Sequence, residues 1–353
     1  MTEKPSQSTR NVLAFQYNGI AILVPLMLMT SLTLNVVALT VPFMVIRAFG
    51  EGTEAYSILR TVSLMFDFKF YTLGIMIIVF SVCFPFVKLF SMSLLWYLPV
   101  NVKLRTRLLH ILCSLGRWSL LDVFVSLVLI VLSHDQSLFV TSTKAGLPLF
   151  LIAICLSMGT GQLMAYLSQK IEGEPEITET EPMRAATGAG WRNFVVPVLL
   201  LGNLLALGAA IGIPYVRITA WYLHDNAYSI IQTVTALFSD GKILFALVVL
   251  AFLVVMPLLR LISLAFLWYV RFPPARFKRV QEICRDVRLW AMLDVFALSL
   301  ILFLAEGGRV IKIEEASGVW ALLAVIVISQ ILSIVTRRVI NTRLAKITAP
   351  PAG

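Results

Sequence analysis

Two stretches of the sequence decide the fold, GRWSLLDVFVSLVLIVL at 116–132 and RLWAMLDVFALSLILFLA at 288–305. Each places a tryptophan shortly before Leu-Asp-Val-Phe and then continues into an apolar run. Their aspartates, Asp122 and Asp294, are 172 residues apart. A recurrence of this length and register indicates that one structural unit occurs twice in the chain.

The match extends well beyond these stretches. The same offset relates the first half to the second without a gap, from Pro42/Pro214 to Gly146/Gly318. Between these ends, Tyr-Ser-Ile at 56–58 recurs at 228–230, and Leu-Trp-Tyr at 95–97 recurs at 267–269. Such blocks in one register are the signature of a tandem repeat.

The composition places both copies in a membrane. Hydrophobic residues make up 59% of the 353 residues and charged residues only 14%, against about 25% charged in a soluble domain. A membrane helix needs about 20 apolar residues, and the chain has enough such runs for eight helices. Four charge-free windows lie between Arg10 and Arg47, Lys144 and Lys170, Arg192 and Arg217, and Glu315 and Arg337. Two further apolar runs, Tyr71 to Tyr97 and Ile243 to Tyr269, are interrupted only by Lys88 and Arg260. The shortest pair of runs covers 118–133 and 290–305.

The predicted fold is therefore an all-α polytopic membrane protein, with eight transmembrane helices arranged as two parallel tandem repeats of four. An even number of helices per unit inserts both copies in the same orientation. The predicted segments are a cytoplasmic tail at 1–17, a first unit at 18–170, a cytoplasmic linker at 171–190, a second unit at 191–347 and a C-terminal tail at 348–353.

The distribution of charge predicts the topology. The net charge of +10 comes from basic residues beside membrane helices, which favours a membrane surface over nucleic acid as the reason for the charge. Lys103, Arg105, Arg107 and Arg117 are predicted in the second loop, six basic residues between 271 and 288 in the sixth, and four more after the last helix. The positive-inside rule places these segments and both termini in the cytoplasm. Loops near 47–69, 134–144, 217–242 and 306–315 then face outward.

Ionisable residues inside the predicted helices mark a candidate site in each unit. Lys88 and Arg260 each follow a proline by three residues, Pro85 or Pro257, and Asp122 and Asp294 lie at the start of the third helix of their units. Ser91 and Ser263 recur one turn beyond the bases. A charge at the centre of a membrane helix costs about 2.5–3.5 kcal/mol on insertion scales, so it usually faces protein or water and has a function.

We predict a substrate or proton path at these positions, which handles a lipid headgroup or a proton, with the prolines freeing backbone carbonyls to line it. If the cytoplasmic loop begins near residue 99, Lys88 lies about 15 Å deep and Asp122 about 6 Å deep. The alternative is an ion pair that only fixes the packing of the second helix against the third.

The sequence predicts no catalytic residue, no metal and no cofactor. The four cysteines form no Cys-x-x-Cys pair, and the histidines His110, His134 and His224 lie in predicted loops or at helix ends. The chain contains no phosphate-binding loop, nucleophile elbow or His-Glu-x-x-His helix. We therefore do not expect an enzyme.

The repeated motif resembles the W-[SA]-[ML]-[LIV]-[DE]-V-F signature of the PqiA/LetA family, the paraquat-inducible protein A-like inner-membrane proteins. The proline and basic residue of the preceding helix are also similar to that family, and the resemblance covers roughly 15–170 and 190–345. Members often carry zinc-ribbon cysteines before each unit, and this chain has none there.

The resemblance implies a bacterial inner-membrane protein that works with a periplasmic MCE-domain partner in moving phospholipid between two membranes. Two functions stay open at this point: a component that loads or extracts phospholipid for the MCE partner, or a membrane anchor that holds this partner without handling lipid.

Neutralising Asp122 and Asp294 separately distinguishes a site from a packing contact. We expect loss of transport at normal membrane levels if the aspartates serve a site, because the fold then does not need their charge. Loss of the protein itself on immunoblots supports the packing role. Both interpretations fail if the two variants are silent.

Overall fold

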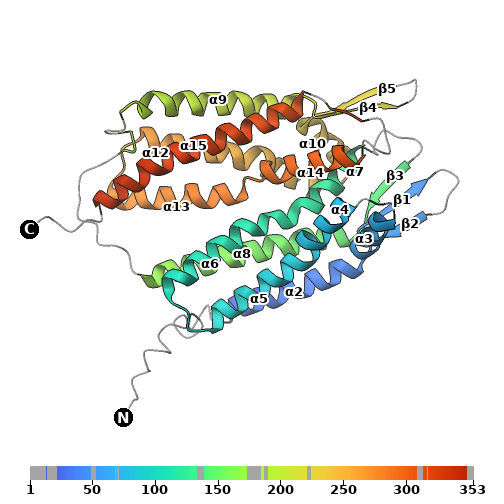
Figure 1. Cartoon of the computed structure of the whole chain (residues 1–353), viewed down its shortest axis with the longest axis horizontal. Coiled ribbons are helices and arrows are strands. Elements are labelled where there is room, and N and C mark those ends of the chain that lie inside the picture. Colours follow the sequence, from blue (N-terminus) through green and yellow to red (C-terminus); the bar gives the residue numbers. More distant parts are fainter. Residues whose placement is uncertain are drawn as a thin grey trace, which may run out of the picture. The chain divides into compact units, whose positions relative to one another are not determined.

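The computed structural model describes residues 13, 22–48, 53–67, 69, 71–132, 139–172, 184–186, 190–220, 224–307, 313–315 and 317–347. The predicted tail at 1–17, apart from Leu13, the tail at 348–353 and His134 lie outside these residues. The chain forms two compact units, Met1–Glu174 and Pro175–Gly353 (Figure 1). Eight helices of the described chain are long and apolar enough to cross a membrane. The prediction of a multi-pass protein with two four-helix repeats is confirmed.

The first unit uses helix segments that join end to end into four spans. The segments are α2 (Leu23–Thr40); α4 (Tyr71–Ile77), η2 (Ile78–Cys83) and α5 (Phe84–Tyr97); α6 (Val102–Gly116), η3 (Arg117–Leu120) and α7 (Leu121–Leu132); and α8 (Gly146–Glu172). Segment η2 is π-helical and η3 is a 3₁₀ turn. The spans are therefore continuous but change their winding at two defined points.

The second unit follows the same plan with one difference. Its segments are α9 (Arg192–Gly212); α11 (Ile243–Val249), π-helical η4 (Leu250–Val255) and α12 (Met256–Tyr269); α13 (Pro274–Trp290) and α14 (Leu293–Gly307); and α15 (Gly318–Ile347). The third span is interrupted at 291–292, where the first unit has its 3₁₀ turn.

The third span of each unit corrects the prediction of basic loops. Most of the basic residues between Lys103 and Arg117 lie on α6, and most of those between Arg271 and Arg288 lie on α13. Arg105 is fully buried, and its Nε donates to Ser168 Oγ at 3.2 Å. The apolar runs at 118–133 and 290–305 are short for a membrane helix because each covers only part of its helical span. The preceding basic segment, which was predicted as a loop, is also helical.

A small antiparallel sheet joins two predicted outward loops in each unit and was not predicted. In the first unit, β1 (Met44–Ala48) lies between β2 (Thr53–Tyr56) and β3 (Phe139–Thr143). In the second, β4 (Val216–Ala220) lies between β5 (His224–Tyr228) and β6 (Ile313–Glu315). Within each unit the strands lie at one end of the helices, which we call the sheet end (Figure 1).

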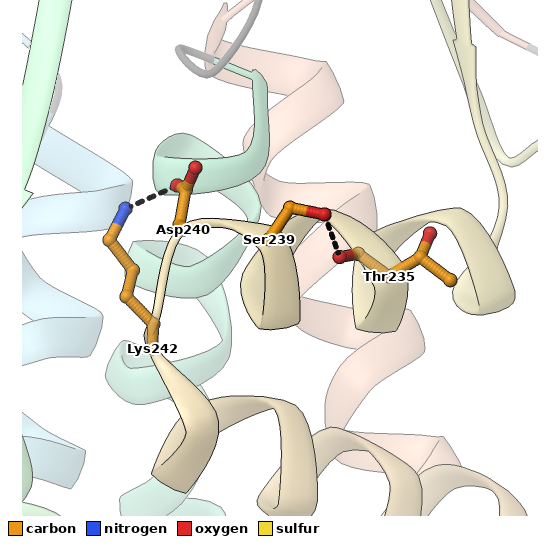
Figure 2. A network of polar contacts seen from close by, with 4 residues as sticks. All are labelled: Thr235, Ser239, Asp240 and Lys242. Atoms are coloured by element: carbon orange, nitrogen blue, oxygen red, sulfur yellow. Dashed lines mark hydrogen bonds and ion pairs between the residues drawn. The ribbon is translucent and has the colours of Figure 1, made fainter.

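A short helix follows the first hairpin of each unit, α3 (Ile58–Asp67) or α10 (Ile230–Ser239). Ser229 and Gln232 form a capping box at the start of α10, which satisfies two backbone N–H groups. Figure 2 shows the far end of α10, where Ser239 donates to the Thr235 carbonyl and Lys242 pairs with Asp240 at 2.8 Å. This ion pair brackets Gly241, whose positive φ of 71° turns the chain into α11.

The sheet end of the second unit is tied to the repeated motif through Tyr215. Its ring meets Phe296 of the motif edge-on at 5.5 Å, and its hydroxyl lies 2.6 Å from Thr233 Oγ1. Full burial raises the pKa of Tyr215 to about 12, and the hydrogen bond to Thr233 partly opposes this shift. Tyr215 therefore stays neutral and packed against α14 and α10.

A glycine closes each unit at the sheet end. The N–H of Gly146, which begins α8, donates to the Pro42 carbonyl at 3.1 Å, and Gly318 of α15 makes the same bond to Pro214 at 2.9 Å. A Cβ on Gly146 would lie 2.7 Å from the Pro42 oxygen. Only glycine allows the fourth helix to approach the backbone after the first helix this closely.

We therefore expect Gly146→Ala to destabilise the first unit by about 1–3 kcal/mol, because the methyl group overpacks against backbone atoms. Gly159→Ala on the same helix is the matched control, since a Cβ there meets no atom within 4 Å. Thermal unfolding in detergent should separate the two variants. Equal melting temperatures would contradict the close contact.

Candidate functional site

A proline after a π-helical turn leaves one backbone carbonyl without a donor in the second helix of each unit. Segments η2 and η4 directly precede Phe84 and Met256, and the prolines Pro85 and Pro257 come next. In the π-helix each carbonyl pairs with the N–H five residues later. Proline has no N–H. The carbonyl five residues before each proline thus lacks its donor in the same helix.

That carbonyl belongs to Phe80 in the first unit and Phe252 in the second. In the second unit the backbone N–H of Met292 donates to the Phe252 carbonyl at 3.4 Å. Met292 lies in the break between α13 and α14. The interrupted third helix therefore supplies the donor that the proline removes from the second.

The tryptophan of the repeated motif packs on the same phenylalanine. The ring of Trp290 stacks on Phe252 at 5.8 Å and 24°. The ring of Trp118 meets Phe80 at 6.2 Å. In both units, then, the motif packs against the π-helical turn. Neither π-helix was predicted, although the phenylalanine and the proline both recur at the 172-residue offset.

Lys88 is the most deeply buried charged group of the site. Its side chain is 1% exposed, and Nζ donates to Ser157 Oγ of α8 at 2.8 Å. Ser157 Oγ in turn donates to the Ile154 carbonyl at 3.0 Å. The ammonium group lies against Gly116, where a Cβ would be only 2.5 Å from Nζ. Lys88 therefore occupies a niche formed by α6 and α8.

Arg260 makes the corresponding contact in the second unit. It is partly buried, and Nη2 donates to the Ser329 carbonyl at 3.2 Å and to the Ser333 hydroxyl. Ser329 lies 172 residues after Ser157. Each base thus joins the second helix to the fourth, and this serine pair was missed although it continues the same register.

Asp122 is not the partner of Lys88. Its side chain is 6% exposed, and no described residue forms an ion pair or hydrogen bond with it. The interpretation as a packing ion pair is therefore wrong in the first unit. Because α6 begins at Val102 and runs on into α7, Asp122 lies about 30 Å along this span from its start, and not one turn inside a helix that begins near Trp118.

Asp294 has a different environment. It is partly exposed at the start of α14, and its Oδ1 accepts the N–H of Val295 at 3.1 Å. A carboxylate at a helix N-terminus is stabilised by the unpaired N–H groups there. Asp294 therefore stabilises the N-terminus of α14.

The remaining predicted residues, two prolines and two serines, lie on the second helix of each unit. Pro85 and Pro257 are buried, and Ser91 is partly buried on α5. The hydroxyl of Ser263 donates to the Arg260 carbonyl of its own helix at 3.0 Å. The structure thus brings each base to the fourth helix and does not bring Lys88 to Asp122. Within the described residues no group of His, Cys, Asp or Glu side chains is placed to hold a metal.

Comparison with known protein families decides what these units are. The model of the family described as Paraquat-inducible protein A matches residues 23–166 and 196–344. The chain belongs to the paraquat-inducible protein A family. The two matched segments correspond to the two four-helix units, so the family model matches each unit once. Comparisons with curated proteins and with solved structures give no match.

The niche of Lys88 predicts the behaviour of Gly116→Ala. The added methyl group displaces the ammonium group from Ser157, and losing a hydrogen bond of this charged donor costs about 1.5–3 kcal/mol. The double variant Lys88→Met/Gly116→Ala should recover most of this loss, because the displaced charge is then gone. Urea unfolding of the four proteins in a double-mutant cycle measures the coupling. Additive effects would show that Lys88 and Gly116 do not interact.

Proposed function

We propose that this protein is the inner-membrane component of an MCE-type phospholipid transport system, which loads or extracts lipid for a periplasmic MCE-domain partner. Membership of the paraquat-inducible protein A family and eight apolar spans support this assignment. In this proposal both termini lie in the cytoplasm and the sheet ends face the periplasm. The positive-inside rule supports that orientation.

The burial of Lys88 carries the proposal. A lysine ammonium placed inside a membrane span with one hydroxyl acceptor is poorly compensated, and burying such an ion costs several kcal/mol. A methionine of similar length would pack there at lower cost. Packing alone therefore does not explain a lysine, and a role in transport does.

The structure favours different uses for the two bases. Lys88 is 1% exposed, so a lipid headgroup does not reach it in this conformation. Of the two candidate substrates, only a proton is small enough to act there. Arg260 is only partly buried, and a guanidinium binds phosphate oxygens well. We assign Lys88 to charge movement and Arg260 to headgroup contact.

The anchor function remains the second candidate, since Arg260 also makes contacts that hold the second helix of its unit against the fourth. An anchor without lipid handling needs these contacts but has no use for the buried charge of Lys88.

Lys88→Met and Arg260→Met form a matched pair that tests the transport function. Each purified variant in nanodiscs is assayed for co-purifying phospholipid by mass spectrometry and for phospholipid transfer to the MCE partner. We expect Lys88→Met to keep or raise the melting temperature and to abolish transfer, because it removes a costly buried charge that has a function. Arg260→Met should reduce the retained phospholipid.

Normal transfer and normal lipid retention in both variants, with the MCE partner still bound, would leave only the anchor function.

A further inference from the structure

Two buried hydroxyl groups of the first unit lie where the second helix meets the third. Ser81 in η2 is 1% exposed and Ser119 in η3 is 2% exposed. Neither Oγ has a hydrogen-bond partner among the described residues. An unpaired buried hydroxyl costs about 1–3 kcal/mol. Each therefore points to a polar ligand.

Both serines lie on segments that pack against the segment of Asp122 or continue into it. Segment η2 packs against η3 and α7, and the contact between the rings of Phe80 and Trp118 fixes this junction. Ser81 and Ser119 directly follow these two rings in the sequence. Ser119 precedes Asp122 by three residues, which places both on one face of the helix. The segments that carry the two hydroxyls and the carboxylate thus pack together at one junction.

The second unit has the same junction without the hydroxyls. Leu253 stands at the position of Ser81, and Ala291 at that of Ser119. The aspartate is retained as Asp294, but it is partly exposed and accepts a backbone N–H of its own helix. The duplicated scaffold therefore carries a polar junction in one copy and an apolar one in the other.

We propose that the first unit alone holds a site for one small monovalent cation, a proton or a sodium ion, at Asp122, Ser81 and Ser119. A lone carboxylate in an apolar interior is costly to keep charged, and a bound cation removes that charge. Hydroxyl and carboxylate oxygens are suitable ligands for such a hard cation. Backbone carbonyls freed by an unwound membrane helix serve the same purpose, and the Phe80 carbonyl before Pro85 is of this kind.

The ionisable groups on the surrounding elements leave this charge uncompensated. They are Tyr71 on α4; Lys88 and Tyr97 on α5; Lys103, Arg105, Arg107, His110 and Cys113 on α6; Arg117 in η3; Cys155, Tyr166, Lys170 and Glu172 on α8; and Cys83 in η2, whereas β3 carries none. The Lys88 ammonium group donates to Ser157, and no described side chain among these groups forms an ion pair with Asp122. A mobile cation is the remaining way to neutralise the carboxylate.

This inference rests on the proposed function in one respect, since an ion gradient is one source of energy for lipid movement. Its test, however, reads the carboxyl group directly. The full-length protein in nanodiscs is titrated with pH, once in sodium and once in choline buffer, and infrared difference spectra follow the carboxylic acid carbonyl band. We expect one band that Asp122→Asn removes and Asp294→Asn leaves in place. Loss of the band with sodium at constant pH identifies sodium, and a response to pH alone identifies the proton.

The pair Ser81→Ala and Ser119→Ala keeps every charge and serves if Asp122→Asn does not fold. Each should shift the band, because each removes a polar hydroxyl from the proposed cation site around the carboxyl. An unshifted band in both, or a band that depends on Asp294, overturns the inference. If the band behaves as expected while phospholipid transfer is absent in all variants, the cation site stands and the lipid function fails.

Discussion

A missing hydrogen bond organises the interior of each unit. Proline cannot donate from its nitrogen, and the π-helical turn ahead of Pro85 and Pro257 leaves a phenylalanine carbonyl without its donor. In a membrane such a carbonyl needs a protein partner. The third helix changes its winding at this level, as a 3₁₀ turn or as a break, and in the second unit it supplies the N–H of Met292. The tryptophan of the repeated motif packs at this junction in both units.

The duplication and the eight spans are visible in the sequence because hydropathy and register extend over many residues. The small sheets were missed because their strands have only three to five residues and pair segments that lie far apart in the chain. The basic turns of α6 and α13 were mistaken for loops because charge density outside the hydrocarbon region does not distinguish a helix from a loop. A helix that projects beyond the membrane can carry as many charges as a loop.

In the structure Lys88 and Asp122 are buried and Arg260 and Asp294 are partly buried, but the sequence did not indicate their partners. Sequence spacing gives depth along a helix and says little about which neighbour a side chain faces. For this reason the contact of Lys88 with Ser157 on the fourth helix, instead of with Asp122, was not predicted. Its niche depends on the absence of a side chain at Gly116, and such an absence carries no signal in a single sequence.

The glycine contacts at the sheet end have a mechanical consequence. The first and fourth helices of the first unit are joined there twice, by Gly146 to Pro42 and by pairing of β1 with β3. Rigid helices fixed at one end separate most at the other, in the manner of tweezers. Any opening between α2 and α8 is thus widest far from the sheet, at the end where Trp96 and Leu109 are buried in the apolar cluster of this unit.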